Sequence, residues 1–368
     1  MNLEKHNQEG VALPISDILL LTKYTVIFPL FTGFIVVCLG YLINNDLFFY
    51  ISLILISLFL FLVMLLFFYK SYTELKSYAI EVAYVHFQPS WRDFIIHIIS
   101  QVYSVVVLGI LLTIFLGSII IDLPQWQYLG LALFISIGYQ VIVVILSLNS
   151  KRKLLATAQT PVNAEIVNHV SQNHPNSHLI NEFRFAEIEL ASLFLSAGVM
   201  THGWKKNICL ISQYFNWKLS DEELIAVLSH EEGHLARRHI RTAYLIIGTE
   251  GFLRTFRIFI VFTALILILN NMPILTFNTF SLIFLILIIL VFITSTCLAL
   301  TRKYHVYLQE IRADSYGGNL VGHELLAKTL KKLPSVIPAP LGKQQEDFLM
   351  FRIALLRYQA NKLESKTG

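Results

Sequence analysis

The chain has 368 residues, of which 55% are hydrophobic and only 14% are charged, with a formal net charge of +4. Soluble domains carry roughly 25% charged residues, so this composition excludes an ordinary soluble protein and predicts a polytopic membrane protein. The small net charge, with no run of five like charges, also excludes nucleic acid as an expected partner.

Four apolar stretches in the first 150 residues are each long enough to cross a bilayer. A helix needs about 20 apolar residues to span the hydrocarbon core. Residues 24–43, 47–69, 94–121 and 126–148 meet this requirement without a Lys, Arg, Asp or Glu. We therefore expect residues 1–150 to form a membrane region of four helices.

Residues 151–242 are mixed polar and charged, and no stretch within them could span a membrane. The segments FAEIELASLFLSAGVM and KNICLISQYF are typical of short strands, whereas NHPNSH and THGWKKN are typical of loops. Ser220, followed three residues later by Glu223, is typical of a capping box and predicts a helix that continues to at least Ile240. We expect this part of the chain to be a small α+β domain.

The remaining sequence is expected to return to the membrane once more. Residues 243–301 predict a transmembrane hairpin, with one helix over 243–270 and a second over 277–301. A polar helical tail follows over 302–368, interrupted by the sequence LPSVIPAPLG. The fold class expected for the whole chain is therefore mostly α, with about six transmembrane helices and a small catalytic domain.

Lysine and arginine residues are distributed unevenly among the segments that connect these helices. Ten lie in residues 149–242 and 11 lie in 302–368, whereas the connectors 44–46, 122–125 and 270–276 contain none. The positive-inside rule therefore places both termini and the mixed polar domain in the cytoplasm.

The sequence LSHEEGHLARRHI contains His230, Glu231 and His234 in the spacing His-Glu-x-x-His. Residues four apart lie on one face of an α-helix, so both imidazoles can bind one metal ion. Glu231 lies beside them but off the ligand axis, where a carboxylate can take a proton from water without binding the metal. With a third ligand from elsewhere, the pattern predicts one catalytic Zn²⁺ that keeps a coordination position open.

The third ligand is expected from a second helix. Glu310, in the tail sequence YLQEIRADSYGGNLVG, is the best candidate, because two intervening membrane crossings return it to the face that carries the histidines. Asp314 lies four residues later on the same helical face and is expected to accept a hydrogen bond from a ligating histidine. His169, His174 and His178 are instead interpreted as a cluster of surface residues in a loop.

The sequences LSDEELIAVLSHEEGHLARRHI and QEIRADSYGGNLVG resemble the zinc helix and the Glu-x-x-x-Asp element of the HtpX and CAAX prenyl endopeptidase superfamily. The segment TAYLIIGTEGFLRTFRIFIVF is similar to the HtpX branch in particular, and the resemblance covers residues 180–360. It implies a zincin-like domain in which the two histidines, Glu310, Glu231 and Asp314 have the roles given above. It also implies that either LASLFLSAGVM or KNICLIS is a strand that pairs with the substrate backbone.

Two features depart from this superfamily. HtpX-type proteins have two membrane spans before the catalytic domain, whereas four are expected here. The superfamily also has a histidine six residues before an arginine near its C-terminus, but here Glu346 stands six residues before Arg352. Arg352 is expected to hold the oxyanion of the tetrahedral intermediate, with His323 as a substitute for the missing histidine.

These observations predict an integral-membrane zinc endopeptidase that cleaves membrane or membrane-proximal proteins at the cytoplasmic face. Its expected partners are protein or peptide substrates and the lipid bilayer, and the resemblance implies quality control in a bacterial inner or plasma membrane. Two alternatives stay open. One is a regulatory signalling peptidase, because FLSAGVMTHGWKKNICLIS is also similar to antirepressor peptidases of the beta-lactam-sensor type, and the other is a non-catalytic membrane scaffold.

Overall fold

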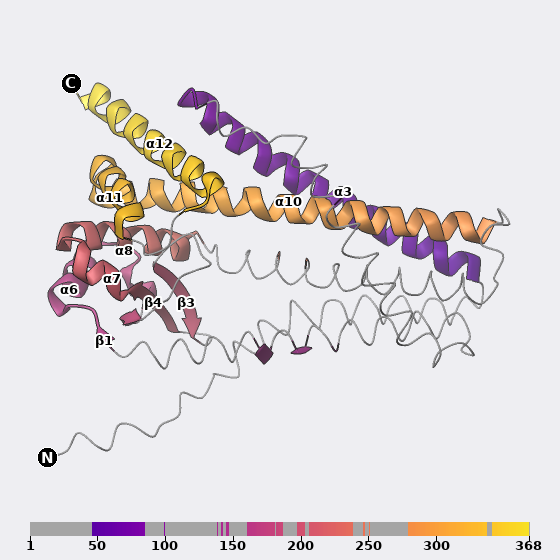
Figure 1. Cartoon of the computed structure of the whole chain (residues 1–368), viewed down its shortest axis with the longest axis horizontal. Helices are drawn as coiled ribbons and strands as arrows, with labels where there is room; N and C mark the ends of the chain where they lie inside the picture. The colour runs from indigo at the N-terminus through magenta and orange to yellow at the C-terminus, as the bar shows by residue number, and fades with distance from the viewer. Residues whose placement is uncertain are drawn as a thin grey trace, which may run out of the picture.

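The computed structural model describes residues 46–84, 160–180, 182–186, 197–202, 206–237, 279–336 and 341–367, with a few isolated positions elsewhere. In chain order, the elements are α3 (Asp46–Glu81), β1 (Thr160–Pro161), α6 (Ala164–Asn173), η2 (Ser177–Leu179), β2 (Glu182–Ala186), β3 (Ala197–His202), β4 (Lys206–Ser212), α7 (Gln213–Lys218), α8 (Asp221–Ala236), α10 (Thr279–Val321), α11 (His323–Val336) and α12 (Lys343–Thr367). Figure 1 shows the two longest helices, α3 and α10, running side by side away from a smaller α/β unit.

Most of the expected membrane topology lies outside these residues. The span expected over 24–43 falls outside the described ranges, as do 94–121, 126–148 and the helix expected over 243–270 apart from isolated helical positions. Within the part of the chain that the structure describes, no helix combines the length and the apolar character needed to cross a membrane. The six-span arrangement therefore stays a prediction.

The sheet has the strand order β1-β2-β4-β3. Strand β4 pairs in parallel with β2 and antiparallel with β3, so it has a neighbour on both sides. Its residues Ile208, Cys209, Leu210 and Ile211 are all buried, which fits a central strand covered on both faces, where an uninterrupted apolar run is expected. The last three residues of the expected strand segment KNICLISQYF instead begin the short helix α7.

Helix α8, which carries the His-Glu-x-x-His sequence, begins where the capping box was expected. The Ser220 Oγ accepts a hydrogen bond from the Glu223 N–H at 3.3 Å, and the Glu223 Oε2 accepts one from the Ser220 N–H at 2.8 Å. The capping box is therefore confirmed. The helix ends at Ala236 with Arg237 as its C-cap, so the expectation that it continues to at least Ile240 is wrong.

A hydrophobic core joins α8 to the sheet on one side and to α11 on the other. On α8, it includes the fully buried Leu228, and on α11 it includes Leu326 and Leu330. A second core joins α3 to α10 and α12, with Leu75 from α3 and Phe351 from α12 among its buried members. Since α10 also packs against α8, it lies between the sheet-bearing unit and α3 (Figure 1).

Helix α10 is continuous over 43 residues and crosses residue 301, where the sequence suggested a boundary between membrane hairpin and tail. Arg312 on this helix joins it to α3. Its Nη2 donates two hydrogen bonds, of 2.6 and 2.7 Å, to the Glu74 carboxylate. The helix ends at Val321, and the following Gly322 has a φ of +96°, a left-handed conformation that favours glycine. That break was not expected. The interruption expected from LPSVIPAPLG is confirmed, because α11 passes through Pro334 but ends inside this segment at Val336, and α12 begins just after it at Lys343.

Candidate metal centre

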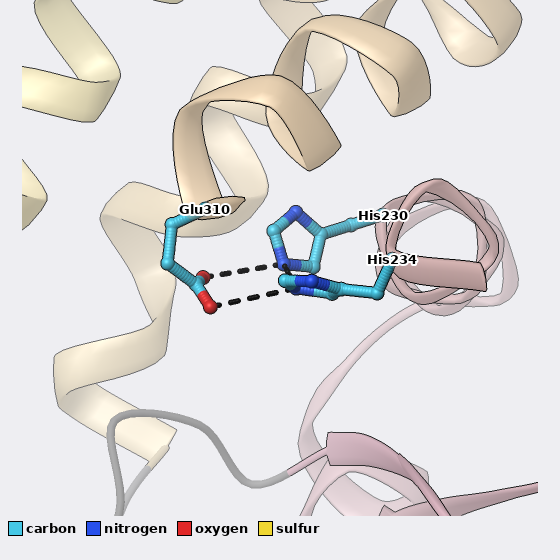
Figure 2. Close-up of side chains that lie close together, drawn as sticks. All are labelled: His230, His234 and Glu310. Atoms are coloured by element: carbon cyan, nitrogen blue, oxygen red, sulfur yellow. Dashed lines mark hydrogen bonds and ion pairs between the residues drawn. The ribbon is translucent and has the colours of Figure 1, made fainter. Parts of the chain in front are cut away.

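Two imidazoles and one carboxylate meet between α8 and α10. The Nε2 atoms of His230 and His234, one turn apart on α8, are 3.1 Å from each other. The two carboxylate oxygens of Glu310 on α10 each lie 3.4 Å from one of these nitrogens, Oε2 from His230 and Oε1 from His234. Figure 2 shows the three side chains directed toward a common point.

The spacing of these three groups fits a tetrahedral metal ion. Two ligand atoms that each lie about 2.0–2.1 Å from a tetrahedral zinc ion are about 3.3–3.4 Å from each other. The observed separations of 3.1 and 3.4 Å are close to this value, and all three groups can offer a ligand atom within 4.8 Å of one another. His234 is less buried than His230 and Glu310, so the cluster is most open to its surroundings on the side of His234. Two imidazoles and a carboxylate can therefore hold a divalent metal and leave one position open.

Asp314 and Arg352 connect the predicted ligands to one another. The Asp314 Oδ1 lies 2.8 Å from the His230 Nδ1, the atom opposite the one that faces Glu310. The guanidinium of Arg352 donates from Nε and Nη2 to the two Asp314 oxygens at 2.6 and 2.7 Å, while its Nη1 lies 3.0 Å from the Glu310 Oε2. Contacts of this kind hold an imidazole in one tautomer and orientation.

The contacts of Arg352 differ from the role expected from the sequence. An oxyanion donor should direct free N–H groups toward the place where negative charge develops. Arg352 is only 2% exposed, and its described partners are the carboxylates of Asp314 and Glu310 on α10. These contacts suit a residue that orients a metal ligand, and the oxyanion role stays a prediction.

The buried charges shift one another's protonation. Burial by itself would raise the pKa of Glu310 and Asp314, but the Arg352 guanidinium and the nearby histidines hold both below their ordinary values. Burial by itself would lower the pKa of His230, yet the Asp314 and Glu310 carboxylates raise it to about 10. Since a ligating imidazole must be neutral, metal binding here has to displace a proton from His230.

Glu231 has a different environment from the carboxylates on α10. It is 2% exposed, and its Oε1 has no hydrogen-bond partner among the described residues. Burial raises the pKa of this carboxyl, although the neighbouring His234 and His230 act in the opposite direction. A buried polar atom without a partner costs free energy and is expected where it serves chemistry. A carboxyl with a raised pKa is suited to accept and return a proton near neutral pH.

Glu232, the residue after Glu231, was not singled out from the sequence. It is fully buried and accepts hydrogen bonds from three groups: the imidazole of His174, the backbone N–H of Asn176 and the hydroxyl of Tyr316. The interpretation of His174 as a surface residue is therefore wrong, because this imidazole is only 6% exposed and pairs with a buried carboxylate. In the sequence, the feature that could have pointed to Glu232 is that a second acidic residue directly follows Glu231.

Helices α8 and α10 approach each other closely enough to require glycine. A Cβ atom on Gly233 would lie 2.9 Å from the Cα of Ala313, and one on Gly317 would lie 3.0 Å from the backbone nitrogen of His230. Real Cβ atoms essentially never approach other atoms within 3.0 Å, so the contact at Gly233 excludes larger residues without a backbone shift. This contact sets how near Glu310 comes to the histidines.

The remaining residues considered from the sequence lie apart from the ligand cluster. His323 is buried at the start of α11, where its ring packs against Gly318. Glu346 is exposed in the first turn of α12, and His169 and His178 are exposed near α6 and η2. The part of the chain that the structure describes gives none of these four a contact with His230, His234 or Glu310.

Comparison with known proteins identifies one family. The model of peptidase family M48 matches residues 167–351, which are 185 of the 368 residues and include all of the ligand cluster. No curated protein matches the chain.

Replacement of Gly233 by alanine tests the close contact between α8 and α10. We expect Gly233→Ala to destabilise this contact by about 1–3 kcal/mol, as overpacking does in well-packed interiors, and to reduce the metal retained after dialysis. Elemental analysis and thermal unfolding of the purified protein measure the two effects. Gly342→Ala is the matched control, because its nearest neighbour would be an ordinary 3.5 Å contact. Equal metal retention by the two variants would contradict the expectation.

Proposed function

The chain belongs to peptidase family M48, and from this premise we propose that it is an integral-membrane, zinc-dependent endopeptidase. The observation that carries the proposal is the convergence of His230, His234 and Glu310 on one point, with the buried carboxyl of Glu231 beside it. The family match supports a metallopeptidase, and the donor set supports zinc as the metal.

The residues of the site would divide the chemistry of peptide hydrolysis among them. His230, His234 and Glu310 would hold the zinc ion, which when bound would supply a Lewis acid for the scissile carbonyl and for water. Glu231 takes a proton from the attacking water as the new carbon–oxygen bond forms, and delivers it to the amine nitrogen as the carbon–nitrogen bond breaks. Asp314 and Arg352 hold His230 and Glu310 in place through these steps.

Replacement of Glu231 by glutamine separates proton transfer from metal binding. We expect Glu231→Gln to lower cleavage of a denatured protein substrate by about 10²- to 10⁴-fold, because an amide cannot accept the proton. Bound zinc, measured by elemental analysis, should be unchanged. Glu222→Gln, an exposed position on the same helix, is the matched control and should retain full activity. Unchanged cleavage by Glu231→Gln would contradict the assignment.

We also propose that β3 is the strand that pairs with the substrate. The sequence left two candidates open, and KNICLIS forms β4, which already has β2 and β3 as neighbours. Strand β3 lies at the end of the described sheet and packs near α8, the helix that carries the histidines. An extended peptide adds to such an edge through its backbone N–H and C=O groups.

Backbone methylation of a peptide substrate tests this pairing. Alternate N–H groups of an extended peptide point to opposite sides, so only every second amide near the cleaved bond can donate to β3. N-methylation should therefore raise KM at alternate positions and leave the positions between them nearly unaffected. Initial rates on a series of singly methylated peptides measure this pattern. A uniform effect, or no effect, would exclude strand pairing.

The proposed membrane location is supported by apolar side chains on the long helices. Leu62, Leu66 and Phe67 on α3 and Ile289 on α10 are each about half exposed or more, at 48%, 69%, 53% and 47%. Exposed apolar side chains offer a surface that lipid can cover. With the clustering of basic residues, these exposures support a bilayer around the apolar ends of α3 and α10 and a site on the cytoplasmic side. Quality control of membrane proteins rests on the resemblance to HtpX.

Because α10 is one continuous helix, the distance from the proposed membrane surface to the metal ligands can be calculated along it. Glu310 lies eight residues after Arg302, the first charge that follows the apolar part of α10. At a rise of about 1.5 Å per residue, the metal ligands would lie about 12 Å beyond the membrane end of the helix. An extended substrate covers about 3.3 Å per residue and so would need about four residues between its membrane span and the cleaved bond.

A spacer series tests the membrane location and this distance together. The protein should remain with membranes after extraction at alkaline pH, and should cleave single-span substrates only when flexible spacers exceed about four residues. Gel analysis of reconstituted vesicles measures cleavage against spacer length. Release of the protein at alkaline pH would exclude membrane integration, and equal cleavage without any spacer would exclude the proposed distance.

A further inference from the structure

The carboxylate of Glu232 lies between the two histidines in sequence but contacts a separate set of groups. Its Oε1 accepts hydrogen bonds from the Asn176 backbone N–H at 2.9 Å and the Tyr316 hydroxyl at 2.7 Å. Its Oε2 lies 2.9 Å from the Nδ1 of His174, which donates to it because an ionised carboxylate only accepts. The Tyr316 hydroxyl in turn accepts a 2.7 Å hydrogen bond from the Asn176 side-chain amide.

This network connects three parts of the molecule that are far apart in the sequence. His174 and Asn176 lie between α6 and η2, Glu232 is on α8, and Tyr316 is on α10. Each oxygen of the fully buried carboxylate has a donor, so its desolvation is offset by charge-assisted hydrogen bonds. Burial and the contact with Glu232 raise the pKa of Tyr316 to about 12, which keeps its hydroxyl protonated as a donor.

The network lies directly beside the contact on which the ligand geometry depends. Tyr316 is two residues after Asp314 and immediately precedes Gly317, which packs against the His230 backbone. On α8, Glu232 immediately precedes Gly233, whose nearest neighbours include the Tyr316 Cβ. A hydrogen bond between Glu232 and Tyr316 therefore opposes rotation or sliding of α8 along α10, and such movement would separate Glu310 from the histidines.

We propose that Glu232 is a positioning residue that holds the two metal-binding helices in register, with His174, Asn176 and Tyr316 as its donors. The inference rests on the proposed metal site and adds a residue outside the ligand cluster. A carboxylate that only stabilised the fold would lower the free energy of unfolding when removed and leave the metal affinity of the folded protein unchanged. A positioning residue changes the metal affinity itself.

Zinc affinity of the full-length protein separates the two roles. We expect Glu232→Ala, which removes the acceptor of all three donors, to weaken zinc binding by about 10- to 100-fold, the usual range for groups that support metal ligands, as measured by competition with a chromophoric chelator. Tyr316→Phe removes a single hydroxyl and should weaken zinc binding less, in the same direction. Glu222→Ala, which removes an exposed carboxylate on α8, is the control and should bind as wild type does.

Combined and conservative variants complete the test. The double variant Glu232→Ala with Tyr316→Phe should bind zinc no more weakly than Glu232→Ala alone, because Glu232→Ala already removes the acceptor of the Tyr316 hydroxyl. His174→Asn, whose amide can donate from near the position of Nδ1, should bind more tightly than His174→Ala. Wild-type zinc affinity in Glu232→Ala and Tyr316→Phe, with only a lower melting temperature, would overturn the inference. Failure of wild type itself to bind zinc would instead overturn the proposed function.

Discussion

The close contact between α8 and α10 is the constraint on which the rest of the site depends. Gly233 meets Ala313, and Gly317 meets the backbone of His230, at distances that leave no room for a Cβ atom without some shift. Only because the two backbones approach this closely can a carboxylate on one helix reach two imidazoles on the other. Small residues at the crossing therefore serve the chemistry as directly as the ligands do.

A balance of buried charge accompanies this contact. The two acidic residues on the site face of α10, Glu310 and Asp314, both pair with one arginine from α12 and lie close to His230. On the other helix, Glu232 is satisfied by three donors, whereas Glu231 keeps one oxygen without a partner among the described residues. The surroundings of these carboxylates thus suit different tasks: Glu310 can bind a metal, Glu232 can hold α8 in place and Glu231 can transfer a proton.

A single helix relates the site to the most apolar part of the described structure. Residues 279–321 form one uninterrupted helix, α10, that packs along α3 over its apolar part and against α8 and α12 near Glu310. Its ion pair from Arg312 to Glu74 joins the two long helices close to the site. The third ligand is therefore held by the same rigid element that packs along α3.

Local patterns in the sequence determined the features that act over a few residues. The capping box at Ser220 sets the start of α8, and the four-residue spacing puts His230 and His234 on one face, because both depend only on helix geometry. The sequence also suggested Glu310 and Asp314 as partners, but not how near they come. Tertiary structure alone decided that His174 is buried against Glu232 and that Arg352 pairs with two carboxylates. Those contacts join residues from 38 to 58 positions apart, and no local pattern specifies which distant donor will meet a buried carboxylate once the helices pack.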